Sequence, residues 1–144
     1  MTSLVESRPA IVLVDDDHHS ARLMTRMLAA HDGPRVEHIP QPADALEQLG
    51  AASKLLVGRS FVVVDLKSSS TATRDFLVAL RGVNPGLLAV AMAPTLDRTV
   101  RNELLDAGAA AVFERHADLD LYRGEAAAIV AFWVRSQRLD AVGT

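Results

Sequence analysis

Two short apolar runs that each end on an acidic residue are the strongest pattern in the chain. The first, Ile11–Val14, is followed by three aspartates that begin at Asp15, and the second, Phe61–Val64, is followed by Asp65. Unbroken runs rich in β-branched residues are typical of strands that are buried on both faces, as in a parallel sheet. We therefore expect two central strands whose carboxyl ends carry carboxylates.

Strand-like segments alternate along the chain with segments whose apolar residues recur at helical spacing. The predicted strands cover residues 10–16, 35–39, 61–65, 87–92 and 110–113. The predicted helices cover residues 18–31, 42–49, 74–81, 97–107 and 121–138, and Gly50 interrupts the second of them. The segment 51–59 is ambiguous and could add a helical turn. The alternation predicts an α/β fold: a doubly wound, flavodoxin-like sheet of five parallel strands in the order 2-1-3-4-5, flanked by five helices.

This strand order places the first and third strands side by side, which brings Asp15, Asp16 and Asp65 to one edge of the sheet. Three carboxylates at one place repel one another unless a cation lies among them. Mg²⁺ is the expected ion, since proteins bind it through one or two carboxylates together with water and phosphate oxygens. We expect Asp16 and Asp65 to be direct ligands, with the backbone carbonyl of Lys67 as a third and Asp15 acting through a water molecule.

Composition and charge narrow the class of protein. The chain has 144 residues, 49% of them hydrophobic, which is enough for one domain with a full core. Its net charge of −3 and its scattered basic residues disfavour nucleic-acid binding. It has no cysteine, and only the adjacent His18 and His19 lie near the acidic residues, which disfavours a zinc site. No apolar run is long enough to span a membrane and no signal peptide is recognisable, so we expect a cytoplasmic protein.

A further motif, Ala107-Gly108-Ala109, lies at the end of the fourth predicted helix. Together with the pair Asp15-Asp16 and with Asp65 at the end of the third strand, it makes the chain from residue 9 to residue 138 similar to a response-regulator receiver domain of two-component signalling. The resemblance implies that Asp65 accepts a phosphoryl group from a sensor histidine kinase or a phosphotransfer protein, while Asp15 and Asp16 hold Mg²⁺. It also implies a downstream protein target, and it is compatible with a homodimer formed through the face of the fourth helix, fifth strand and fifth helix.

The chain departs from the receiver pattern beside the acceptor. Ala93 stands where the family has a Thr or Ser whose hydroxyl meets the phosphoryl group. One of the hydroxyl side chains in the loop 68–71 could replace it, although a solvated loop is the simpler interpretation. Lys67 points either to solvent or toward the mouth of the pocket, where it could do part of the work of the family's lysine.

The fifth strand departs from the pattern as well. Arg115 occupies the place of the family's lysine and keeps the positive charge, in a longer, planar side chain that could grip phosphate from a different position. The aromatic switch position falls on Val112, with Phe113 one place later. We therefore expect any switch in this chain to be non-standard.

These observations leave two functions open. The first is a single-domain response regulator that is phosphorylated on Asp65 and signals through protein–protein contacts. The second is a phosphorylation-independent pseudo-receiver that acts as an interaction module. We favour the first, because clustered carboxylates are costly to keep in an apolar pocket. We expect no enzymatic activity, since a hydrolase that uses Asp65 as a nucleophile would need an acid two residues later, where the chain has Lys67.

The ends of the chain complete the prediction: a leader at 1–9, the receiver domain at 10–139 and a tail at 140–144. Only six residues follow Arg138, too few for a helix-turn-helix, so we expect no direct DNA binding. The last helix carries Phe132 and Trp133 next to each other, and one of them is expected to remain free for a partner. Charged residues near the face used for pairing could form cross-pairs: Arg98, Arg101, Asp118 and Asp120.

Overall fold

A parallel sheet is the central layer of the fold. The computed structural model describes residues 10–51 and 60–143. The sheet has five strands in the order β2-β1-β3-β4-β5. Their bounds are β1 (Ala10–Asp15), β2 (Arg35–Ile39), β3 (Ser60–Asp65), β4 (Leu88–Ala93) and β5 (Val112–Glu114). The helices of the described ranges are α2 (His18–Ala30), α3 (Pro42–Ala51), α5 (Ala72–Val83), α6 (Arg98–Ala107) and α7 (Leu119–Gly143).

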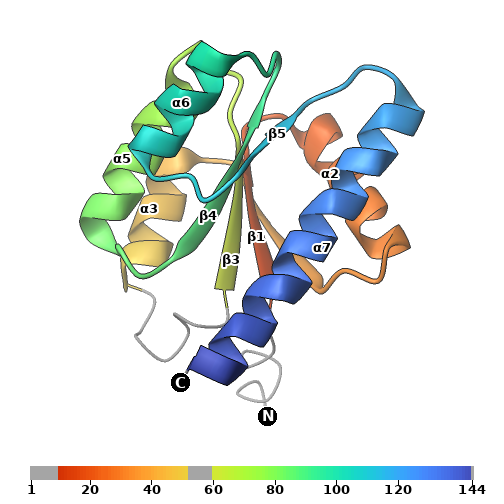
Figure 1. The fold of residues 1–144 in the computed structure, drawn as a ribbon. Coiled ribbons are helices and arrows are strands. Elements are labelled where there is room, and N and C mark those ends of the chain that lie inside the picture. Colours follow the sequence, from red (N-terminus) through yellow and green to blue (C-terminus); the bar gives the residue numbers. More distant parts are fainter. Residues whose placement is uncertain (1–9, 52–59, 144) are drawn as a thin grey trace.

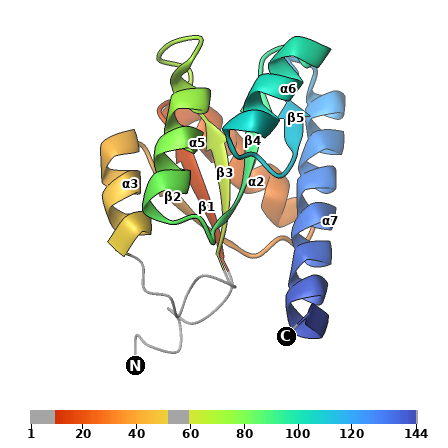
Figure 2. The same cartoon turned by 60° about the vertical axis from the view of Figure 1, so that its left-hand side comes forward.

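Helices cover both faces of the sheet (Figure 1). α3, α5 and α6 lie on one face, and α2 and α7 lie on the other, as the turned view in Figure 2 also shows. Val62 and Val64 of β3 belong to the core under the first group, whereas Phe61 and Val63 belong to the core under the second. Each central strand is thus buried on both faces, which explains its unbroken apolar sequence. The predicted α/β class and strand order are confirmed.

Local residues fix where the helices begin and end. Asp17 caps α2 by accepting a hydrogen bond from the backbone N–H of His19 at 3.1 Å. Asp97 caps α6 in the same way through the N–H of Val100 at 2.8 Å. Gly108 follows α6 with a φ of 124°, a conformation that favours glycine.

The structure corrects several predicted boundaries. Gly50 does not interrupt its helix, because α3 continues to Ala51. The reason for the glycine is packing: a Cβ on it would lie 3.3 Å from the Cβ of Val83 on α5. The last helix extends to Gly143, five residues beyond its predicted end at residue 138. The predicted leader 1–9 and most of the ambiguous segment, residues 52–59, lie outside the described residues.

The prediction that one aromatic residue of the last helix stays free is wrong. Phe132 and Trp133 are both partly buried against the core under α2 and α7. The ring centroid of Phe132 lies 6.0 Å from that of Phe61 and 6.5 Å from that of Phe113. α7 can bury both residues because it contacts α2 as well as β5.

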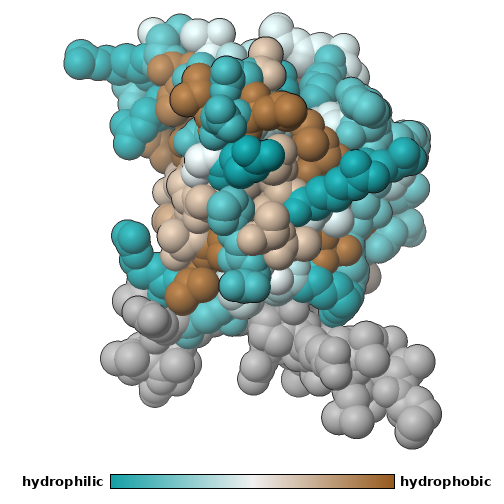
Figure 3. Space-filling model, turned by 90° about the vertical axis from the view of Figure 1, so that its right-hand side faces the viewer, coloured by the Kyte–Doolittle hydropathy of each residue, from teal (hydrophilic) through white to brown (hydrophobic). Residues whose placement is uncertain are grey.

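The surface beside α7 is mixed in character. In Figure 3 hydrophobic side chains lie among hydrophilic ones on this side of the molecule. Among the side chains of α7 that the structure describes, up to residue 137, the exposed large hydrophobic ones are Leu119, Leu121 and Val134. Within the described ranges, no helix combines the length and the hydropathy that crossing a membrane requires.

Candidate functional site

Asp15 and Asp65 end the two central strands in register. Their Cα atoms are paired across β1 and β3, and both residues are fully buried. The register follows from the matched length and apolar pattern of the two strands. As the sequence predicted, two carboxylates are therefore brought together at the carboxyl edge of the sheet, where ligands of open α/β sheets bind.

The side chain of Lys67 lies between these two carboxylates. Its Nζ donates to Asp15 Oδ1 at 2.7 Å and to the backbone carbonyl of Asp65 at 3.0 Å, and it lies 3.2 Å from Asp65 Oδ2. Of the two orientations that the sequence left open, the structure shows the one that points into the site. Lys67 reaches it because side chains two residues apart on an extended chain face the same side.

Arg115 neutralises Asp65 from the other side. It follows β5, where its backbone N–H donates to the carbonyl of Ala93 at 2.7 Å. Its Nε and Nη2 both donate to Asp65 Oδ1, at 2.9 and 2.7 Å. The carboxylate of Asp65 thus has one cation near each oxygen, Arg115 at Oδ1 and Lys67 at Oδ2. Charge-assisted hydrogen bonds such as those from Arg115 are about twice as strong as neutral ones.

Asp16 has a different role from its neighbour. Its carboxylate accepts hydrogen bonds from the backbone N–H of Lys67 at 2.9 Å and from that of Ser68 at 3.0 Å. These bonds tie the start of the β3–α5 loop to the end of β1. They also fix the backbone from which the Lys67 side chain extends toward Asp15.

Two further residues that the sequence analysis did not identify lie beside the acids. His38 on β2 places its Nε2 2.8 Å from the backbone carbonyl of Asp15. Tyr122 on α7 is buried, and burial together with the negative charges of Asp65 and Asp15 raises its pKa well above the ordinary value near 10. Its hydroxyl therefore stays protonated. A tyrosine one turn into the last helix carries no sequence pattern that would have revealed this position.

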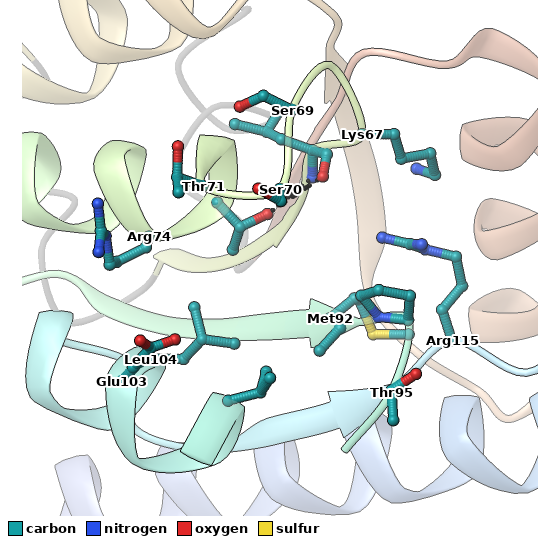
Figure 4. Close-up of a pocket in the computed structure, with 15 residues that line it drawn as sticks. Lys67, Ser69, Ser70, Thr71, Arg74, Met92, Thr95, Glu103, Leu104 and Arg115 are labelled. Atoms are coloured by element: carbon teal, nitrogen blue, oxygen red, sulfur yellow. Dashed lines mark hydrogen bonds between the residues drawn. The ribbon is translucent and has the colours of Figure 1, made fainter. Parts of the chain in front are cut away.

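A cavity of about 560 Å³ opens next to the ionic site, between the β3–α5 loop and the β4–α6 loop (Figure 4). Ala93 lies on its wall, 2% exposed, where the family resemblance places a hydroxyl. Lys67 and Arg115 line the same cavity, and Figure 4 shows their charged ends on one side of it. The small side chain of Ala93 contributes no hydrogen-bond donor to this space.

Hydroxyl side chains of the β3–α5 loop line the same cavity, namely Ser69, Ser70 and Thr71. The hydroxyl of Thr71 donates to Asp75 Oδ2 at 3.1 Å, and that of Thr73 accepts from the backbone N–H of Leu66 at 3.1 Å. Ser68, Ser69 and Ser70 are exposed. Thr95, two residues after Ala93, also lines the cavity and was not among the predicted site residues.

Similar structures are known, although no protein-family model and no curated protein sequence matches the chain. The response-regulator receiver domain from Rhodospirillum rubrum superposes with a TM-score of 0.72 at 18% sequence identity, covering 88% of this chain and 94% of that one. A CheY-like receiver domain protein from Methanospirillum hungatei gives 0.71 at 14% identity, covering 95% and 99%. This chain has the receiver-domain fold.

Another structure with this receiver fold is the Mn²⁺-bound form of the response regulator Rcp1, which superposes with a TM-score of 0.68 at 14% identity over 87% of this chain and 94% of that one. The present receiver fold arranges its acids differently from the predicted metal site. The ammonium group of Lys67 lies between Asp15 and Asp65, and the carboxylate of Asp16 is bonded to loop N–H groups. Among the described residues, no group of three or more His, Cys, Asp or Glu is placed to hold a metal ion. As arranged, the predicted ligands do not fit a divalent ion.

The histidines at the start of α2 point to the surface, as expected of an exposed helix start. His18 and His19 are exposed, and the ring of His18 packs edge-on against that of His38 at 5.5 Å. The Lys67 contact was the main feature that the sequence did not settle. A lysine two residues after a strand-ending aspartate was the available sign, because that spacing returns the side chain to the same side of the strand.

Proposed function

We propose that this chain is a cytoplasmic response regulator that accepts a phosphoryl group on Asp65 from a histidine kinase or a phosphotransfer protein. It signals by changing its contacts with a downstream protein and has no catalytic turnover of its own. The observation that carries this proposal is the convergence of Lys67 and Arg115 on the two oxygens of Asp65. Cations at this distance from a carboxylate also lie close to a phosphoryl group attached to it.

The transfer itself is an in-line displacement. An oxygen of Asp65 attacks the phosphorus of a phosphohistidine, the O–P bond forms, and the P–N bond breaks. The released imidazole of the donor takes up a proton from solvent. Positioned positive groups assist such a transfer by stabilising the charge on the phosphoryl oxygens. Arg115 is suited to this role, because its planar guanidinium can donate to two oxygens at once.

The switch follows from the same bonds. Phosphorylation turns the Asp65 carboxylate into an acyl phosphate, whose phosphoryl oxygens then attract Arg115 in its place. The backbone of Arg115 is bonded to Ala93 at the end of β4. Movement of Arg115 would therefore be transmitted to the loops after β4 and β5. This route replaces the hydroxyl that Ala93 lacks, and it links Asp65 to the surface around α6 and the start of α7.

That surface is the proposed contact face for a partner or a second copy. Leu119 and Leu121 at the start of α7 are more than half exposed, at 53% and 57%. Charged side chains of both signs surround them, including Asp120, which pairs with Arg123 at 3.1 Å. Partly exposed apolar residues within a charged rim are typical of protein-binding surfaces.

A phosphorylation-independent interaction module is the second candidate. It is favoured by the closure of the site, since Asp65 is fully buried and has a cation at each of its oxygens. In this case Lys67 and Arg115 would hold the loops in one conformation permanently, and the downstream contact would not depend on a donor.

Phosphorylation of the full chain tests the first function against the second. The protein is incubated with acetyl phosphate or phosphoramidate, with Mg²⁺ in one set of samples and a chelator in the other, and its intact mass is measured. We expect the wild type to gain one phosphoryl group and Asp65→Asn to gain none. Asp75→Asn, which removes an exposed carboxylate of α5, is the matched control and should be labelled normally. No labelling of the wild type under either condition, where an ordinary receiver is labelled, would favour the interaction module.

A further inference from the structure

The ammonium group of Lys67 occupies the place at which the sequence predicted a metal ion. We propose that it substitutes for a divalent cation, so that the acidic site of this receiver is complete without metal. The substitution itself stands on the geometry of the unphosphorylated site. Its consequence, that phosphoryl transfer proceeds without metal, rests also on the function proposed above.

Charge balance supports the substitution. The two fully buried carboxylates, Asp15 and Asp65, are matched by two cations, Lys67 and Arg115, all within hydrogen-bonding or ion-pair distance. Like charges in a buried site are unfavourable unless opposite charges neutralise them. Here the protein supplies both of the positive charges from its own side chains, so the two buried carboxylates need no further cation.

The position of the Lys67 ammonium group also supports the substitution. Lys67 Nζ lies 2.7 Å from Asp15 Oδ1 and 3.2 Å from Asp65 Oδ2, so an ion bridging the two carboxylates would have to displace it. The side chain is 23% exposed and its backbone is held by Asp16 through the Lys67 N–H. The same bonds engage the carboxylate of Asp16, the second acid expected to bind metal.

Removal of the positive charge at residue 67 is the direct test. Isothermal titration with Mg²⁺ and with Mn²⁺ is carried out on the wild type, Lys67→Met and Lys67→Gln. We expect the two variants to bind at least about tenfold more tightly than the wild type, because a cation in contact with both carboxylates is removed. Lys67→Gln retains a hydrogen-bond donor for Asp15, so it separates the effect of charge from that of the lost hydrogen bond.

A matched control tests whether any lost cation has this effect. Arg74 lines the same cavity, but its Nη2 pairs with Asp75 at 3.2 Å and not with the buried acids. Arg74→Gln should leave metal affinity at the wild-type level. A gain as large as that of Lys67→Gln would overturn the proposal, as would wild-type binding as tight as that of the Lys67 variants.

The labelling experiment gives a second readout that does not depend on the stability of a variant. Equal phosphorylation of the wild type in chelator and in Mg²⁺ supports the substitution, whereas phosphorylation only in Mg²⁺ overturns it. Absence of labelling in both samples counts against the proposed phosphoryl transfer alone. In that case the titration of the wild type and its variants still decides whether Lys67 excludes a metal ion.

Discussion

Asp15 and Asp65 are register partners in neighbouring strands, and their buried carboxylates share one ammonium group, that of Lys67. An acid pair of this kind is stable only with a cation in contact, because the charged form of a carboxylate is strongly disfavoured in an apolar interior. The stability of the fold is therefore coupled to the groups that surround the candidate acceptor.

Replacement of Lys67 by Met should destabilise the protein by about 1–3 kcal/mol, because Asp15 would lose a charged donor while remaining buried. Chemical denaturation measures the loss. Arg74→Met removes an exposed cation in the first turn of α5 and should change stability by less than about 0.5 kcal/mol. When Lys67→Met is combined with Asp15→Asn, the double variant should regain part of the stability that Lys67→Met loses. If the effects of the two substitutions on the free energy of unfolding simply add, the direct contact between the two side chains is contradicted.

Arg115→Gln should slow phosphorylation of Asp65 about tenfold or more, because a positioned positive charge is lost at the acceptor. Arg115→Lys should be less affected, since the charge is retained while the two-pronged contact with Asp65 Oδ1 is lost. The rates are obtained from time courses of intact mass with a small phosphoryl donor. Equal rates for both variants and the wild type would show that Arg115 serves the folded structure and not the transfer.

Ala93→Thr should restore a hydroxyl at the wall of the cavity at a cost below about 1.5 kcal/mol, because the neighbouring space of about 560 Å³ can accept the larger side chain. We expect the variant to show a larger difference in hydrogen exchange between its phosphorylated and unphosphorylated forms, concentrated in the loop after β4. Ala93→Val, which adds similar volume without a donor, is the control. An equal response in both variants would exclude the hydroxyl as the cause.

Tyr122 should remain protonated in the folded protein at pH values where free tyrosine ionises. Its pKa is raised in the folded state, so its contribution to stability is fully present below about pH 10 and is lost as the pH rises through the folded pKa. Because it is the single tyrosine of the chain, absorbance of the phenolate reports it directly during an alkaline titration. In Tyr122→Phe the free energy of unfolding should fall less steeply than in the wild type as the pH rises above about 10. Ionisation near pH 10 in the folded state would contradict this prediction.

The apolar runs Ile11–Val14 and Phe61–Val64 determined the two central strands, because only a strand buried on both faces tolerates an unbroken apolar sequence in this fold. The alternation of strands and helices then determined the class and the strand order. The meeting of Asp15 with Asp65 followed, since the carboxyl ends of adjacent parallel strands lie at one edge.

Tertiary structure alone decided how these charges are satisfied. The sequence required a cation among the acids, but an ammonium group, a guanidinium or a metal ion can each fulfil that requirement. The choice depends on which side chains reach the carboxylates. Lys67 lies between Asp15 and Asp65 and comes from the adjacent loop, whereas Arg115, 50 positions after Asp65, contacts Asp65 from its other side. Such placement is a property of the packed chain, because it depends on the positions of β1, β3 and β5 relative to one another and not on any local pattern.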